Sequence, residues 1–151
     1  MKNIFLSAMA IALSSTPVFS QNIFKCEFNK NGTRGWISSW AFVHIDKSGS
    51  HIFDGNTGWI NKGAAPLRVL KKENDKIKYE WTLRTTSRNK QKFLSRYTMT
   101  FPASGTGKAN MDMKLNNSRT QREFARGSCE ADGTISKERF LSWAAKESKS
   151  N

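Results

Sequence analysis

Four side chains of types that can bind a metal ion lie close together in the sequence. They are His44, Asp46, His51 and Asp54. The sequence Lys47–Ser50 between them predicts a turn, so a hairpin would bring the two sides together. Two imidazoles and a carboxylate could hold a metal ion. The spacing matches no established ligand motif, however, and a third firm ligand is missing. The pattern therefore favours ordinary histidines and predicts no metal site and no cofactor.

Other catalytic patterns are weaker still. The stretch Ser104–Lys108 (SGTGK) resembles a phosphate-binding loop, but it lacks the full spacing and is expected between strands. The chain has no Gly-x-Ser-x-Gly elbow for a nucleophilic serine. Acidic residues are too sparse for an obvious pair of glycosidase carboxylates. We therefore expect a protein that is not an enzyme, with a hydrolase of unrecognised site as an alternative.

The distribution of charge points to binding instead. Basic residues outnumber acidic ones by 25 to 12, a net charge of +13. No acidic residue occurs between Glu80 and Asp112, whereas six basic residues do. A concentrated positive field attracts polyanions. The alternative is a solvated surface that only keeps a small protein soluble.

The candidate anion-binding residues lie on one predicted hairpin. They are Arg84, Arg88, Lys90, Lys92 and Arg96. Apolar residues alternate with polar ones from Ile77 to Thr85 and again from Phe93 to Phe101, which is typical of two half-buried strands. On this alternation Arg84, Lys92 and Arg96 point outward. Arg88 and Lys90 fall at the tip between the strands.

The two cysteines, Cys26 and Cys129, are the only ones in the chain. They lie in the first and last predicted strands, and they can pair in one way only. We expect a disulfide and hence an oxidising compartment. The alternative is two buried free thiols.

The pattern of short strands predicts a mainly β fold. About eight short strands, joined by turns, favour a small antiparallel β-barrel or sandwich. The segment 54–58 is expected to be a turn and Trp59–Ile60 a short strand. Phe124 and Cys129 point to opposite faces of an unbroken strand, so we expect a bulge near Gly127. Helical spacing predicts one C-terminal α-helix over residues 134–149.

The N-terminal segment looks like a signal peptide. Residues 1–20 combine Lys2 with a short apolar run and small residues before Gln21. Residues 21–151 would then form a single β domain, which we expect to be a monomer without a membrane span, in the periplasm or secreted. Because Lys2 is the one charged residue of the segment, the remainder carries 24 basic and 12 acidic residues.

Four short motifs give the chain a resemblance to small secreted, disulfide-bonded bacterial β proteins. They are Phe24–Phe28 (FKCEF), Gly35–Ile37 (GWI), Tyr79–Thr82 (YEWT) and Phe124–Cys129 (FARGSC). The resemblance implies export and the disulfide, and it implies no activity or site residues. The size and the disulfide are also similar to those of periplasmic barrel inhibitors of lysozyme, but a strongly basic chain would be repelled by a basic target.

These observations predict an exported, non-catalytic binding protein. Its partner would be an anionic lipid, lipopolysaccharide or another polyanionic polymer of the cell envelope. A lipocalin-like carrier, with the aromatic interior as its pocket, is an alternative. An interior cavity would favour the carrier, whereas salt-dependent binding would favour the polyanion.

Overall fold

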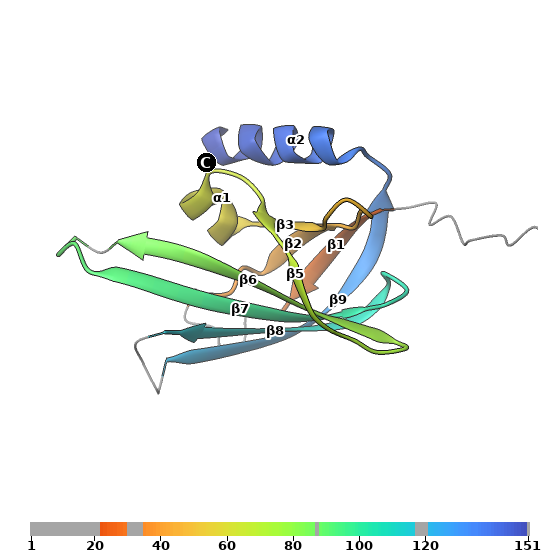
Figure 1. Cartoon of the computed structure of the whole chain (residues 1–151), viewed down its shortest axis with the longest axis horizontal. Coiled ribbons are helices and arrows are strands. Elements are labelled where there is room, and N and C mark those ends of the chain that lie inside the picture. The colour runs from red at the N-terminus through yellow and green to blue at the C-terminus, as the bar shows by residue number, and fades with distance from the viewer. Residues whose placement is uncertain (1–21, 30–34, 87, 117–120, 151) are drawn as a thin grey trace, which may run out of the picture.

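The described chain folds as an antiparallel barrel with two helices on one side. A computed structural model describes residues 22–29, 35–86, 88–116 and 121–150. In these ranges nine strands form one antiparallel sheet, which curls into a nearly closed barrel (Figure 1). The strands are β1 (Ile23–Phe28), β2 (Trp40–His44), β3 (His51–Asp54), β4 (Ala65–Pro66), β5 (Arg68–Lys72), β6 (Lys76–Thr86), β7 (Lys92–Pro102), β8 (Gly107–Leu115) and β9 (Arg122–Gly133). The helices are α1 (Gly55–Asn61) and α2 (Lys137–Ser150).

The mainly β fold with a C-terminal helix is thus confirmed, and the barrel is the form it takes. The predicted signal peptide, residues 1–20, lies outside the described residues. Within the described part of the chain, neither helix has the length and hydropathy that crossing a membrane requires.

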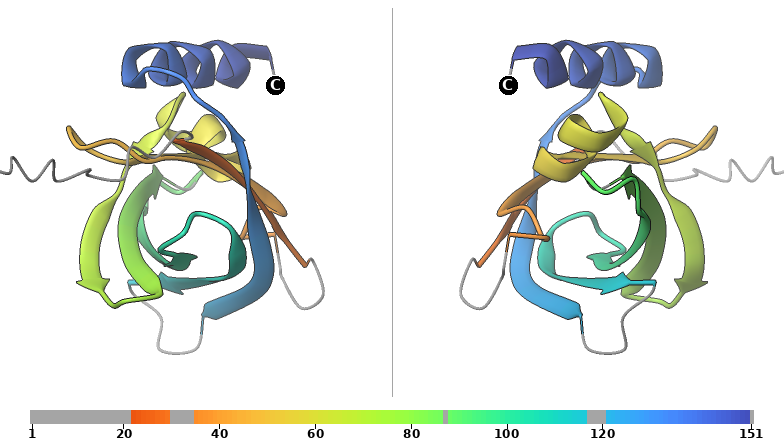
Figure 2. Two further views of the ribbon diagram at one scale, coloured as in Figure 1. Left: turned by 90° about the vertical axis from the view of Figure 1, so that its right-hand side faces the viewer. Right: turned by 90° about the vertical axis from the view of Figure 1, so that its left-hand side faces the viewer.

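The order of strands around the barrel follows the order of the chain. From edge to edge the sheet runs β4-β3-β2-β1-β9-β8-β7-β6-β5. The two edge strands, β4 and β5, are separated in sequence by Leu67 alone. The chain therefore passes directly from one edge strand to the other at the seam, the place where the two edges of the sheet face each other. The view along the barrel shows the resulting ring of strands (Figure 2).

The longest hairpin supplies much of the interior. β6 and β7 pair over 11 residues each, with the predicted alternation of faces. Their inward side chains are buried: Tyr79, Trp81, Leu83, Tyr97, Met99 and Phe101. The Trp81 and Tyr97 rings stack with centroids 5.2 Å apart. Large apolar and aromatic residues at every second position thus fill the barrel from this side.

The disulfide between Cys26 and Cys129 is confirmed. The two residues are direct partners in the register of β1 and β9, with a sulfur–sulfur distance of 2.00 Å. Both are buried inside the barrel. The bond therefore joins the first and last strands across a separation of 103 residues.

Helix α1 replaces a turn and a strand, so the predictions for 54–58 and Trp59–Ile60 were wrong. Asp54 accepts a hydrogen bond from the Thr57 N–H at 2.7 Å, and Thr57 Oγ1 accepts one from the Asp54 N–H at 2.8 Å. This reciprocal capping box satisfies backbone donors at the helix start. The helix ends at Asn61, and its C-cap residue Lys62 adopts a left-handed conformation. Gly55 and Asn56 are residues that favour turns, but the capping box stabilises a helix at this position.

Helix α2 begins three residues later than predicted. Ser136 Oγ accepts a hydrogen bond from the Arg139 N–H at 3.3 Å, which is N-cap geometry. Its buried residues are Phe140 and Ala144. The helix lies above α1 on the side of β2 and β3 (Figures 1 and 2).

Aromatic contacts attach α2 to the barrel. The Trp143 ring meets Phe42 and Phe53 edge-on, at centroid distances of 5.2 and 5.1 Å. The Phe140 ring stacks on His44 at 5.2 Å. The outer face of β2 and β3 is thereby covered, whereas the outer face of β6 to β9 is not.

Strand β9 is unbroken at Gly127, so the predicted bulge is wrong. Register with β8 runs without a shift from Arg122 to Cys129. Phe124 accordingly lies on the outer face, where it is 47% exposed. Gly127 serves another purpose, since a Cβ there would lie 2.0 Å from the carbonyl oxygen of Glu27 on β1. Glycine permits the close approach of β1 and β9.

Candidate anion-binding groove

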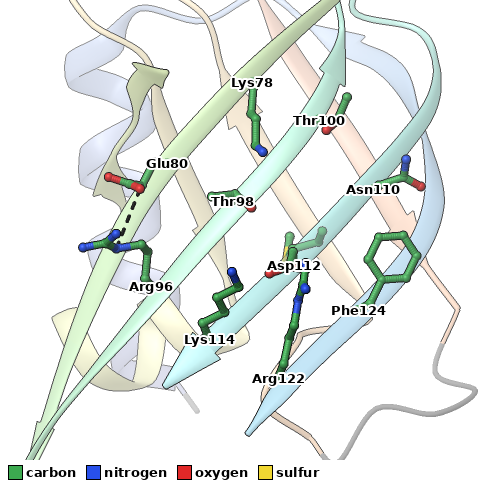
Figure 3. Close-up of a pocket in the computed structure, with 11 residues that line it drawn as sticks. Lys78, Glu80, Arg96, Thr98, Thr100, Asn110, Asp112, Lys114, Arg122 and Phe124 are labelled. Carbon is green, nitrogen blue, oxygen red and sulfur yellow. Dashed lines mark hydrogen bonds and ion pairs between the residues drawn. The ribbon is translucent and has the colours of Figure 1, made fainter. Parts of the chain in front are cut away.

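The outer faces of β6, β7, β8 and β9 hold an open hollow of about 370 Å³ (Figure 3). Four cations line it: Lys78, Arg96, Lys114 and Arg122. They come from four different strands, because the alternation of each strand sends every second side chain outward. Barrel packing on the inner face thus fixes which residues meet on the outer face.

Three of these cations stand in one row across the sheet. Register pairs Arg96 with Lys114, and Lys114 with Arg122. Neighbouring strands are about 4.8 Å apart, so the three backbone positions span about 10 Å. Like charges directly opposite one another destabilise a sheet. This cationic row (Arg96, Lys114, Arg122) therefore brings together three positive charges that repel one another unless acids or a ligand lie beside them.

The two acids in the hollow are already neutralised. Glu80 pairs with Arg68 and lies 3.8 Å from the Nε of Arg96. Asp112 accepts a hydrogen bond from the Nε of Arg122 at 2.7 Å. These carboxylates hold the arginine side chains over the sheet, and each guanidinium has further N–H donors beyond those that the acids accept. Their presence lowers the repulsion within the row without removing its positive sign.

Two lysines complete the positive field. Lys78 and Lys114 are exposed and make no ion pair with any described residue. Four cations against two acids leave the hollow with an excess of two positive charges. A negatively charged ligand would meet mobile ammonium groups beside oriented guanidinium groups, and both types bind carboxylate, sulfate or phosphate.

An exposed aromatic ring borders the hollow. Phe124 stands opposite Asp112 in the register of β8 and β9. The guanidinium of Arg126, two residues along β9, lies over the ring at 5.6 Å from its centroid. This cation–π contact keeps another positive group at the edge of the hollow.

A second hollow, of about 840 Å³, adjoins the first on the outer face of β8, β9 and β1. Its cations are Lys25, Lys108 and Arg126. The one acid in its lining, Glu27, lies 2.7 Å from the Nζ of Lys25. The charge of this hollow is therefore also positive.

The structure places the five predicted anion-binding residues at different distances from the hollow. Register puts Arg84 diagonally next to Lys92 and Arg96 on the outer face. Arg88 and Lys90 are exposed in the connection between β6 and β7. Of the five, Arg96 alone lines the hollow.

Sequence reasoning missed Lys114 and Arg122. The signal for Lys114 was available, because the inward alternation of Met111 and Met113 makes it outward-facing. Arg122 was missed because Phe124 was expected to point into the core. Arg122, two residues away on the same strand, would then point inward as well. Which outward residues stand side by side depends on strand register, and sequence alternation does not give the register.

The histidine–aspartate set does not form a metal site. His44 is buried, and its Nε2 donates a hydrogen bond to the Ile135 carbonyl at 3.0 Å. His51 is its partner across β2 and β3, but Asp54 is buried in the capping box. No group of three possible ligands that could hold a metal ion occurs among the described residues. The carboxylate of Asp46 accepts hydrogen bonds from the backbone N–H and the hydroxyl of Ser48, and these bonds hold the pKa of that carboxyl below its usual range.

Comparison with known proteins gives no relative. No family model, curated protein or solved structure matches the chain. The function must therefore be argued from the geometry of the outer face.

Proposed function

We propose that the protein is an exported, non-catalytic binding protein for an anionic component or polymer of the cell envelope. The observation that carries the proposal is the cationic row Arg96, Lys114 and Arg122, three like charges on adjacent strands of an uncovered face. Arg96 and Arg122 each lie beside an acid, but four cations against two acids leave the hollow with an excess of two positive charges, which a ligand of opposite charge would account for.

Export is part of the proposal. Its support is the signal-like pattern of residues 1–20 together with the Cys26–Cys129 bond. Cysteine pairs of this kind persist in oxidising compartments such as the periplasm or the cell exterior. Fractionation of cells expressing the full chain, with N-terminal sequencing of the product, tests this part separately.

The alternative functions have less support. A lipocalin-like carrier needs an apolar interior pocket, but the inward residues of β6, β7 and β8 are almost fully buried against one another. The two hollows lie on the outer face of the barrel, and each is lined by several charged side chains. A hydrolase needs a nucleophile, base or metal in a cleft, and the carboxylates of the first hollow are engaged by arginines.

Binding of heparin, a polyanion of defined chemistry, tests the proposal. The variant Arg96→Gln/Lys114→Gln/Arg122→Gln should bind about tenfold to a hundredfold more weakly, since each exposed charge pair contributes on the order of 0.5–1 kcal/mol. Its affinity should also depend less on salt concentration, because fewer ions are exchanged. Isothermal titration calorimetry over a series of salt concentrations gives both quantities.

A control variant with the same change of charge separates the site from general attraction. Arg84→Gln/Arg88→Gln/Lys90→Gln removes three positive charges outside the lining of the hollow. It should bind within about threefold of wild type. Equal losses in the two variants would mean that net charge alone draws the polymer. Failure of wild-type protein to bind heparin, when its cooperative thermal unfolding shows that it is folded, would refute the proposal.

A further inference from the structure

The two outer hollows meet. Asn110 lines both of them, and register places it opposite Arg126, which lines the second. Arg126 in turn covers the ring of Phe124, which lines the first. The Asn110–Arg126 pair and Phe124 thus form a junction rather than a wall between the hollows.

The combined surface is long and crosses the strands. It extends from Lys78 on β6 to Trp40 at the start of β2. The strands in between are β7, β8, β9 and β1, so the path covers five strand spacings. At about 4.8 Å each, its length along the barrel wall is about 24 Å. A single phosphate or carboxylate would occupy a small fraction of this length.

Positive charge continues through both parts. Lys108 and Arg126 make no ion pair with any described residue, whereas Glu27 is already paired with Lys25. The acid nearest the junction on the other side, Asp112, is paired with Arg122. A chain of negative groups would therefore find a cation in each hollow and at the junction.

Neutral hydrogen-bonding groups stand between the cations. The first hollow contributes Thr98 and Thr100, and the second contributes Ser39 and Ser128. Hydroxyl side chains can both donate and accept, which suits the hydroxyl groups of a sugar. Cations for acidic groups and hydroxyls for polar rings are the complement of an acidic polysaccharide.

Two other polyanions fit this surface less well. A lipid needs exposed apolar surface for its chains, but Phe124 is the one exposed large apolar residue that borders either hollow in the described chain. A single-stranded nucleic acid stacks successive bases on aromatic rings. Here Phe124 is the one exposed ring in the lining and Arg126 lies over it, while Trp40 is half-buried against Phe42 and Phe53.

We propose that the two hollows form one continuous groove that binds a linear acidic polysaccharide across the strands. This inference rests on the proposed function and names the ligand class and the extent of its site. Carboxylate or sulfate groups of the chain meet the cationic row and the pair Lys108 and Arg126. The sugar hydroxyls bond to the threonine and serine side chains between them.

A length series of heparin oligosaccharides, from the disaccharide upward, tests the continuity of the groove. Affinity measured by calorimetry at one salt concentration should rise at least tenfold from the shortest fragments to those that reach both hollows. The variant Lys108→Gln/Arg126→Gln should abolish most of this gain. Lys108→Gln alone, which changes a residue of the second hollow only, should leave the affinity for the shortest fragments within about twofold of wild type. The control Arg84→Gln/Arg88→Gln, which removes two cations outside both hollows, should keep the gain.

The outcomes separate this inference from the proposed function. Longer chains also bind better because they offer more registers, but that gain would persist in Lys108→Gln/Arg126→Gln. Persistence would overturn the continuous groove and leave an anion site in the first hollow. Tighter binding of a single-stranded oligonucleotide or of anionic vesicles than of heparin at equal charge would overturn the ligand class. Failure of every fragment to bind would refute the proposed function itself.

Discussion

At the residue scale, Asp54 is a buried acid whose protonation should affect the free energy of unfolding. Its carboxyl caps α1 and is fully buried at one end of the barrel. Burial raises the pKa of Asp54 to about 6 from an ordinary value of 3.8, although hydrogen bonds from Thr57 oppose the shift. Burial also raises the pKa of the Tyr97 hydroxyl, with further contributions from the charges of Asp54 and Glu123.

The raised pKa predicts a dependence of stability on pH. The native state holds the Asp54 proton more tightly than the unfolded chain does. This contribution to the free energy of unfolding is therefore complete below about pH 4 and is lost as pH rises through about 6. Its size is about 3 kcal/mol, from a pKa difference of about two units.

Asp54→Asn keeps a capping side chain and removes the titration. The difference in unfolding free energy between wild type and this variant should change by about 3 kcal/mol between about pH 4 and 7, in favour of the variant at higher pH. Urea unfolding at several pH values gives the difference. Asp46→Asn is the matched control, because the lowered pKa of Asp46 gives the opposite sign. A constant difference for Asp54→Asn would contradict the prediction.

Single residues were predictable where alternation was clean. The inward set of β6 and β7 and the outward direction of Arg84, Lys92 and Arg96 follow from period two alone. Phe124 was not predictable in this way, because an aromatic residue is usually placed in the core. The alternation of faces along an unbroken strand puts Phe124 and Cys129 on opposite sides, and this is what β9 shows, with Cys129 inward and Phe124 outward.

At the scale of elements, the two helices show what local sequence can and cannot reveal. α2 was predicted from the spacing of Phe140, Trp143 and Ala144, with an error of three residues at its start. α1 is seven residues long and begins with poor helix formers. Its capping box and its packing between β3 and α2 stabilise it, and the second of these is a tertiary effect.

The packing of α2 predicts the effect of a substitution at its centre. Trp143→Ala removes edge-on ring contacts with Phe42 and Phe53 and a tilted one with Phe140, so it should lower the free energy of unfolding by about 2–4 kcal/mol. Trp59→Ala on α1 is the control, because Trp59 is 70% exposed and its loss should change stability by less than about 0.5 kcal/mol. Urea denaturation compares the two. Equal effects would show that α2 is not held by Trp143.

At the scale of the whole molecule, the disulfide joins the first and last strands of the chain, which lie side by side. β1 pairs with β9 in the middle of the sheet, and the seam lies at β4 and β5. Sequence reasoning anticipated that first and last strands lie side by side, because the cysteines had no other partners. It could not locate the seam, since β4 and β5 are short strands joined by one residue.

Replacement of both cysteines measures this link. Cys26→Ala/Cys129→Ala should lower the free energy of unfolding by about 4–5 kcal/mol, the entropy of a loop of about 100 residues. Thermal unfolding of the variant and of wild type with and without reductant gives the comparison. Thiol labelling of denatured, unreduced wild type should find no free thiol. Two labelled cysteines in protein recovered from cells would contradict an oxidising destination.

The ring-like order of strands also has a kinetic consequence. All strand pairs except β1–β9 join neighbours in sequence, so hairpins can form one after another with short loops. The β1–β9 pair must instead bring together residues 103 positions apart. Closing so long a loop is entropically unfavourable until the other strands have shortened the effective distance. Pairing of β1 with β9 also brings the two thiols within bonding range. Oxidation of this cysteine pair would then mark a completed ring, and its rate would report the last step of assembly.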